Sequence, residues 1–224
     1  VRILCVDIAH GHHILMKKML YDLREIFRDA VHIMAGNVAT LAAFNDLADW
    51  GADSIRVGIG GGSICSTRTQ TGHGMPTLES IISCASSDRS AKLIADGGLR
   101  TSGDIVKALA AGADFVMLGS MLAGHAETPG DAIFINGQKR KVYRGMASKD
   151  AQIEWRGRTS SVEGVSSTVS YRGGVAEKLH EIKTGIRSGL SYTGARNLCE
   201  FRSRALFIEQ SSSGATEGLT HINL

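Results

Sequence analysis

Proline and aromatic residues are scarce in this chain of 224 residues, which has 2 prolines and an aromatic fraction of 5%. Its 4 cysteines (Cys5, Cys65, Cys84 and Cys199) lie far apart and form neither a C-x-x-C pair nor a cysteine–histidine spacing typical of zinc sites. This pattern favours a reduced, cytoplasmic location.

Features that would indicate a membrane or a nucleic acid as partner are also missing. No apolar run reaches the roughly 20 residues of a membrane span, and no charged and then apolar leader opens the sequence. The 25 basic and 22 acidic residues are interspersed and leave a formal charge of +3. This balance therefore predicts neither a membrane nor a nucleic acid partner.

Glycine, in contrast, is abundant, and the 27 glycines are gathered in short clusters. The hydrophobic fraction of 43% is large enough to fill the core of a folded domain. Clustered glycine predicts loops whose bare backbone approaches a ligand.

Short β-branched segments alternate with longer amphipathic segments along the chain, which predicts repeated β-α units. The predicted strands are residues 1–7, 32–37, 54–58, 91–96 and 115–119. The predicted helices between and after them are residues 14–27, 41–50, 78–86 and 102–110, with another helix opening at 120–123. Continuous apolar strands are typical of a parallel sheet that is buried on both faces and covered by helices.

Successive β-α units without a reversal favour a (β/α)8 barrel, also called a TIM barrel, over an open doubly wound sheet. Five strands cannot close an eight-stranded barrel. We therefore expect residues 1–210 to form the carboxy-terminal part of one barrel domain, with about three β-α units missing from its front. Closing helices are expected near residues 175–186 and 195–206, and residues 211–224 are expected to form a flexible tail.

The β-α rhythm breaks between residues 133 and 171. Asn136 and Gly137 are typical of a hairpin turn, and residues 148–170 are polar and poorly patterned. Because long irregular segments in compact domains are more often functional than accidental, residues 147–170 are expected to form an active-site flap.

The most informative segment is the glycine-rich loop at residues 58–68, which directly follows the third predicted strand. In a barrel, active-site loops follow the carboxyl ends of the strands. Cys65 lies in this loop beside hydroxyl-bearing residues, and a thiolate there could attack an electron-poor ring carbon. A cysteine taken at random is better interpreted as a small buried residue, and that interpretation is kept for the other three cysteines.

A second group of glycines follows the fourth and fifth strands. Asp96, Gly97 and Gly98 end one strand, and Gly119 and Ser120 end the next. Each group alone is an ordinary turn, but loops one β-α unit apart with exposed amides form a phosphate cradle in barrels. Their spacing therefore favours phosphate binding.

Residues 60–67, 94–98, 117–120 and 143–146 together resemble the IMP dehydrogenase/GMP reductase family, and the match follows the family's motif order over nearly the whole chain. The resemblance implies that Cys65 bonds to purine C2 and that Thr67 assists proton transfer. It also implies a set of substrate-binding residues, which hold the ribose, the phosphate and the base: Ser63, Asp96, Gly97, Gly98, Gly119, Ser120, Gly145, Met146 and Ala147.

The resemblance further implies a nicotinamide dinucleotide (NADP or NAD) at the strand end formed by Asp7, Ile8 and Ala9. It implies a potassium ion held by the backbone carbonyls of Gly60, Gly62 and Cys65, and a homotetramer. Glu163 matches the family's glutamate, which exchanges protons with Thr67 as a general acid or base. On sequence pattern alone, Glu163 is better interpreted as an exposed loop residue.

Two reactions and one inactive form remain open. The dehydrogenase oxidises IMP to XMP and activates water with an arginine–tyrosine pair on the flap, whereas the reductase converts GMP to IMP and ammonia. Residues 155–158 contain no such pair before Glu163, which favours the reductase, although residues 143–146 and 162–165 look more dehydrogenase-like. A fragment that only binds nucleotide or assembles with other subunits is the third possibility.

Overall fold

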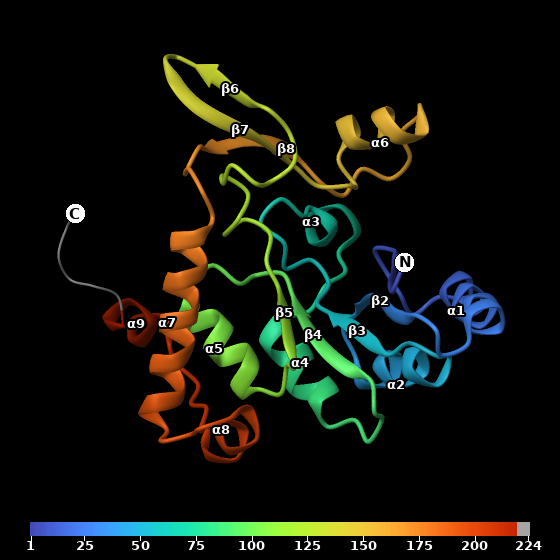
Figure 1. Ribbon diagram of the computed structural model, residues 1–224, viewed down its shortest axis with the longest axis vertical. Helices are drawn as coiled ribbons and strands as arrows, with labels where there is room; N and C mark the ends of the chain where they lie inside the picture. Colours follow the sequence, from blue (N-terminus) through green and yellow to red (C-terminus); the bar gives the residue numbers. More distant parts are fainter. Residues whose placement is uncertain (219–224) are drawn as a thin grey trace.

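The centre of the molecule is a parallel sheet whose five strands lie in sequence order, as Figure 1 shows. The computed structural model describes residues 1–218. The strands of this sheet are β1 (Ile3–Asp7), β2 (His32–Val38), β3 (Ser54–Val57), β4 (Lys92–Asp96) and β5 (Phe115–Met117). Because all of them run in the same direction, the loops that follow them meet along one edge of the sheet.

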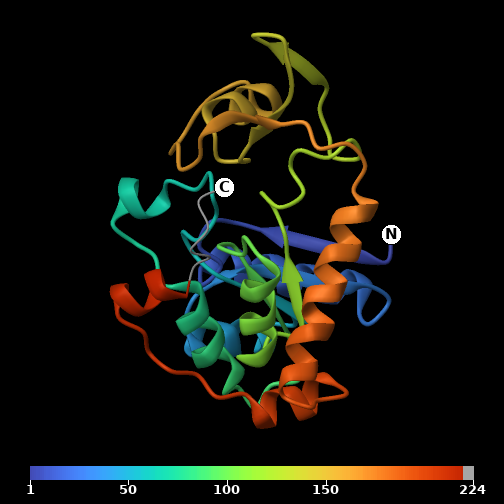
Figure 2. The same ribbon diagram turned by 90° about the vertical axis from the view of Figure 1, so that its left-hand side faces the viewer.

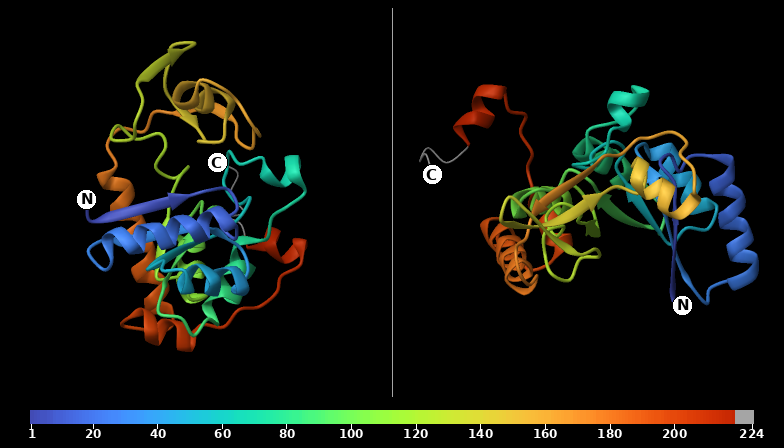
Figure 3. Two further views of the ribbon diagram at one scale, coloured as in Figure 1. Left: turned by 90° about the vertical axis from the view of Figure 1, so that its right-hand side faces the viewer. Right: turned by 90° about the horizontal axis from the view of Figure 1, so that it is seen from above.

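Helices connect successive strands and pack against the sheet. They are α1 (Ile14–Phe27), α2 (Leu41–Asp49), α4 (Thr77–Ala85) and α5 (Ser102–Ala110), with the short α3 (Thr67–Thr71) preceding α4. Two later helices, α7 (Ala176–Tyr192) and α8 (Leu198–Arg204), pack against α5. The last one, α9 (Ser212–Glu217), stands apart from the body of the molecule in the view from above (Figure 3).

Helix α5 illustrates how local sequence sets an element's start. The Thr101 side chain accepts a hydrogen bond from the Asp104 backbone, and the Asp104 carboxylate accepts one from the Thr101 backbone, which completes a capping box. Partial burial opposes the charge on Asp104, but hydrogen bonds from the Arg100 amide and from the hydroxyl and amide of Thr101 hold the pKa of its carboxyl below the ordinary value.

A single hydrophobic core lies between the sheet and its helices. It combines strand residues such as Ile33 and Ile55 with helix residues such as Leu20, Phe44 and Ile105, all of which are fully buried. Cys84 of α4 also lies in this core, and burial raises the pKa of its thiol to about 12. The interpretation as a small buried residue is confirmed for Cys84 and is wrong for Cys5 and Cys199, which are exposed.

The two outer strands differ from the expectation that every strand is buried on both faces. In β1, exposed and half-buried residues alternate, and in β5 no residue is fully buried. Ile3 and Phe115 are both 59% exposed. The prediction was wrong for these strands because each is paired on one side only, β1 with β2 and β5 with β4.

A second sheet lies beyond the carboxyl ends of the parallel strands (Figure 2). Its antiparallel strands are β6 (Ala132–Ile135), β7 (Gln138–Arg144) and β8 (Ser166–Ser170). The predicted hairpin turn is confirmed: Asn136 and Gly137 join β6 to β7 with φ values of 50° and 75°, as a tight hairpin of this kind requires.

Three sequence expectations need correction. The segment expected to be irregular contains β8 and α6 (Lys149–Arg156), a helix that Ser148 caps and Gly157 ends. Residues 120–123 form turns rather than the start of a helix. The segment expected to be a flexible tail contains α9, while residues 219–224 lie outside the described residues.

Within residues 1–218, no helix has both the length and the apolar character that crossing a membrane requires.

Adjacent isoleucines of α4 provide a test of the core. Ile81 is 1% exposed and Ile82 is 43% exposed. Alanine changes the helix propensity equally at both positions, but it leaves a cavity in the core only at Ile81. We expect Ile81→Ala to lower the free energy of unfolding by about 2–5 kcal/mol and Ile82→Ala by much less. Urea denaturation of both variants measures this difference, and equal losses would contradict the described packing.

Candidate active site

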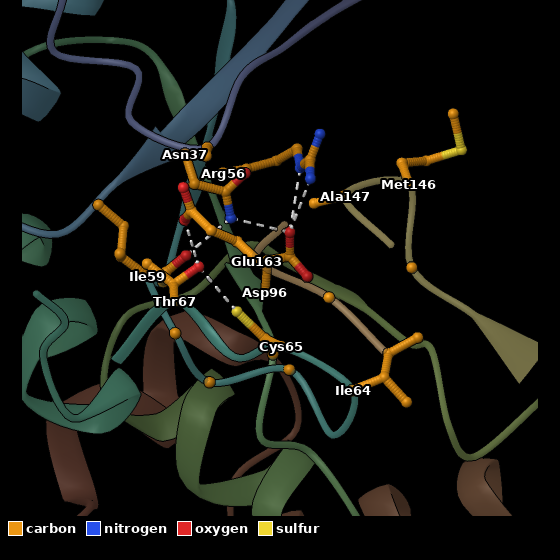
Figure 4. A pocket seen from close by; sticks show the side chains of 18 of the residues that line it. Asn37, Arg56, Ile59, Ile64, Cys65, Thr67, Asp96, Met146, Ala147 and Glu163 are labelled. Carbon is orange, nitrogen blue, oxygen red and sulfur yellow. Dashed lines mark hydrogen bonds and ion pairs between the residues drawn. The ribbon is translucent and has the colours of Figure 1, made fainter. Parts of the chain in front are cut away.

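A cavity opens at the carboxyl ends of the parallel strands, between them and the second sheet. Figure 4 shows Cys65 at this cavity, with Asn37, Arg56 and Asp96 on neighbouring strands. The loops approach each other closely here, since a side chain at Gly58 would place its Cβ 2.0 Å from the carbonyl oxygen of Asp96. Gly58 also has a φ of 142°, which strongly favours glycine.

A chain of hydrogen bonds links the three predicted catalytic residues. The thiol of Cys65 lies 3.1 Å from Thr67 Oγ1, and that hydroxyl donates to Glu163 Oε2 at 2.8 Å. The second carboxylate oxygen, Oε1, accepts from the Ser161 hydroxyl at 3.0 Å. Cys65 is exposed while Thr67 and Glu163 are half-buried, so a ligand can reach the sulfur and the relay behind it is shielded.

Backbone pairing brings Glu163 to the cysteine loop, although the two are far apart in sequence. The amide of Ser66 donates to the carbonyl of Glu163 at 2.8 Å, and the amide of Val165 donates to the carbonyl of Ile64 at 3.0 Å. On the other side, the amide of Glu163 donates to the carbonyl of Ala147 at 3.2 Å. The glutamate is therefore held between the cysteine loop and the turn that follows β7.

A charged cluster lies deeper in the same cavity. Arg56 Nη1 lies 2.9 Å from Asp7 Oδ1, and Arg56 Nη2 lies 3.0 Å from Asp96 Oδ2. Asn37 also donates to Asp96 Oδ2, at 2.9 Å. Burial opposes the charge on Arg56, but the carboxylates of Asp96 and Asp7 outweigh it and raise the pKa of the guanidinium above its ordinary value.

A second cavity adjoins the first and shares Ala9, Ile59, Thr67 and Glu163 with it. Its remaining lining includes polar side chains, contributed by His10, Thr40, Thr71 and His73. Thr67 and Glu163 thus lie between the two cavities, and each cavity could hold one of two reacting molecules.

Tyr143 connects the second sheet to the glycine loops. Its hydroxyl lies 3.1 Å from Ser63 Oγ, and a Cβ at Gly119 would come within 3.2 Å of the same hydroxyl. Two hydroxyls and a bare glycine backbone therefore converge near the end of β5.

Most of the residues predicted from sequence come together. The first cavity is lined by these predicted residues: Asp7, Ile8, Ala9, Gly60, Gly62, Cys65, Thr67, Asp96, Gly97, Gly145, Met146, Ala147 and Glu163. Four predicted residues lie outside its lining, namely Ser63, Gly98, Gly119 and Ser120. Ser63 and Gly119 meet at Tyr143, whereas Gly98 lines a separate small cavity beside α5.

Sequence reasoning missed Arg56, Asn37 and Tyr143. A signal existed for Arg56, because a charged residue inside an otherwise buried strand is rare unless it is paired. Asn37 ends a predicted strand, and Tyr143 lies in a motif noted only for its neighbours. Neither carried a local signal of its role, since their partners are distant in sequence.

Comparisons with known proteins show the family to which the chain is similar. A family model described as "IMP dehydrogenase / GMP reductase domain" matches residues 1–221. Similar proteins include an inosine-5'-monophosphate dehydrogenase of Nitrosopumilus maritimus, 43% identical over 98% of this chain and 49% of the relative. A GMP reductase of Leishmania major is 42% identical over 98% of this chain and 47% of the relative.

Among solved structures, a cysteine-to-alanine variant of the GMP reductase of Trypanosoma brucei, in complex with guanosine 5'-monophosphate, matches with a TM-score of 0.93. It is 44% identical and covers 100% of this chain and 48% of its own. The chain thus spans about half the length of the curated relatives it matches. The family model, the sequence identities and the shared fold show that the chain belongs to the IMP dehydrogenase/GMP reductase family.

Proposed function

We propose that this chain is the carboxy-terminal part of a TIM-barrel oxidoreductase that acts on a purine nucleotide through a covalent bond from Cys65. The observation that carries the proposal is the hydrogen-bonded series of Cys65, Thr67 and Glu163 at the mouth of one cavity. Folding alone does not require an exposed thiol, a hydroxyl and a carboxylate to be linked by hydrogen bonds. Their contact argues against an inactive remnant that only binds nucleotide.

The incomplete barrel is supported by the edges of the parallel sheet. Five strands in sequential order fit a segment of an eight-stranded barrel. Apolar side chains on both edge strands, Ile3 and Phe115, are more than half exposed, and exposed edges of this kind need further strands as partners. About three additional β-α units would close the barrel.

Three neighbouring groups of residues would hold the substrate. The purine base would lie against Cys65, with Gly145, Met146 and Ala147 beside it. The ribose would contact Asp96 and Gly97. The phosphate would lie on the predicted cradle of Gly98, Gly119 and Ser120, which we extend to include Ser63 and Tyr143, because their hydroxyls meet beside Gly119.

GMP reductase is the reaction that the chain supports best. The thiolate of Cys65 adds to C2 of GMP, and the bond from C2 to its amino nitrogen breaks as Thr67 and Glu163 deliver a proton, so that ammonia leaves. Bound NADPH would supply a hydride to C2. The bond between Cys65 and C2 then breaks, which releases IMP and restores the thiolate.

IMP dehydrogenase is the alternative, since named relatives of both kinds are about equally similar. That reaction needs a base to activate water for hydrolysis of the covalent intermediate. The chain has no adjacent arginine–tyrosine pair in residues 147–170. A missing base is a chemical deficit, and it is the reason for favouring the reductase.

Two further ligands belong to the proposal. A nicotinamide dinucleotide would extend into the second cavity next to Thr67, since Ala9 lines both cavities while Asp7 and Ile8 line the first. The carbonyls of Gly60, Gly62 and Cys65 would hold potassium. Gly62 already accepts from the Cys65 amide at 3.1 Å, but a carbonyl has two lone pairs and can bind a cation as well. Such an ion would hold the cysteine loop in shape.

The family membership also supports a homotetramer and a cytoplasmic location, and both remain part of this proposal.

Removing the thiol tests the covalent step. In the complete protein with GMP and NADPH, we expect Cys65→Ala to abolish NADPH consumption, because no other group lies in position to bond to C2. Cys199→Ala, which removes another exposed cysteine, is the control and should retain the activity. Unchanged turnover in Cys65→Ala would refute the mechanism.

Glu163 should matter for rate more than for binding. We expect Glu163→Gln to lower kcat by roughly 10²–10⁴-fold, as general acid–base groups do, with little change in the dissociation constant for GMP. Steady-state kinetics and titration calorimetry measure the two quantities. The exposed Glu209→Gln is the matched control, and a Glu163→Gln variant of full activity would exclude a proton-transfer role.

The direction of the reaction is decided by a paired assay. Incubated with IMP and NAD, the complete wild-type protein should form little XMP, whereas GMP and NADPH should yield IMP and ammonia. Rapid XMP formation would assign the dehydrogenase reaction instead.

A further inference from the structure

Arg56 occupies a prepared position inside the parallel sheet. Its neighbours in β3, Ile55 and Val57, are fully buried, and its own side chain is only 12% exposed. The adjacent strand leaves space for it, since a Cβ at Gly36 would lie 2.6 Å from Arg56 Cβ. Any side chain at residue 36 would therefore displace the arginine.

The guanidinium joins two carboxylates that belong to different parts of the site. It reaches Asp7 at the end of β1 and Asp96 at the end of β4, as the dashed lines to Asp96 in Figure 4 indicate. Arg56 Nε adds a second hydrogen bond to Asp96 Oδ2, at 3.1 Å. One planar cation thus fixes carboxylates on both sides of the cavity.

The remaining oxygens of these carboxylates are available to ligands. Among the described residues, the hydrogen bonds to the Asp96 side chain all end on Oδ2, so Oδ1 can accept from a ribose hydroxyl. Asp7 is 52% exposed at the cavity. An aspartate held by one oxygen presents the other in a fixed direction, which lowers the entropic cost of binding.

We infer that Arg56 is a positioning residue that holds Asp96 for the purine nucleotide and Asp7 for the dinucleotide, and thereby sets the affinity of both subsites together. This inference rests on the proposed function of the site. Arg56 contacts neither the hydrogen-bonded series of Cys65, Thr67 and Glu163 nor the reacting carbon. Its replacement should therefore weaken substrate binding rather than slow the chemical step.

The test measures KM for both substrates in the complete protein. We expect Arg56→Met to raise KM for GMP and KM for NADPH, each roughly tenfold to a hundredfold, since charged hydrogen bonds contribute effects of that size. The change in kcat should be much smaller. Arg56→Lys should partly restore both KM values, because lysine keeps the charge but lacks the rigid fork that holds two carboxylates.

Arg89→Met is the matched control. Arg89 also pairs with two aspartates, Asp49 and Asp88, but on the exposed surface away from the cavity. Its replacement should leave both KM values unchanged. Thermal unfolding shows whether each variant is folded, and if Arg56→Met does not fold, Arg56→Lys decides the question.

Three outcomes would overturn the inference: wild-type KM values in a folded Arg56 variant, a rise confined to one substrate, or a loss of kcat alone. Failure of the proposed reaction is a separate result. If wild-type protein consumes no NADPH with GMP but converts IMP with NAD, the same variants are assayed with that pair. If it does neither, calorimetric titration of GMP and of NADP into wild type and variant applies the same criteria to the dissociation constants.

Discussion

Pairing of backbone segments 64–66 and 163–165 is the interaction on which the candidate site depends. Thr67 and Glu163 are 96 positions apart in the sequence, and the carboxylate reaches the hydroxyl because the two loops exchange main-chain hydrogen bonds. Gly164 takes part in bridges with both Cys65 and Ser148. Main-chain contacts hold the side chains of Thr67 and Glu163 in a fixed geometry, which is the preorganisation that the proposed proton transfer requires.

The pairing of segments 64–66 and 163–165 also explains how the second sheet contributes to the candidate site. Strands β7 and β8 pair with each other, and this pairing brings Glu163 to the first cavity and Tyr143 to Ser63, outside the lining of that cavity. The parallel sheet supplies the other wall, with Cys65 after β3 and Asp96 at the end of β4. The candidate site therefore lies between loops of two sheets, because Cys65 follows a strand of the parallel sheet and Glu163 precedes β8 of the second sheet.

Burying the charge of Arg56 has an energetic cost that packing alone would not justify. A buried ion pair is rarely more stabilising than an apolar side chain of similar size, and the cluster of Asp7, Arg56 and Asp96 lines the same cavity as Cys65. Groups of this kind concentrate at functional sites because fixed charges are needed there. Asp7, Arg56 and Asp96 all line the first cavity at the carboxyl ends of the strands.

Local sequence patterns determined much of this fold. The helices at residues 14–27 and 102–110 were predicted with their observed bounds, and Asn136 and Gly137 marked the hairpin. These features depend on contacts between neighbours, so a short stretch of residues contains the information. The predicted nucleophile, hydroxyl and glutamate also lie in contact, although the glutamate was placed by family resemblance and not by pattern.

Only the tertiary structure decided the pairings between distant segments. Strand β8 is a polar stretch that becomes a strand only because β7 offers it hydrogen bonds. The roles of Arg56, Asn37 and Tyr143 come from partners on other strands or loops. The sequence by itself established which residue types could perform the chemistry. The tertiary structure decided which of them share one cavity, where the ends of the parallel strands meet the second sheet, because such contacts have no local signature.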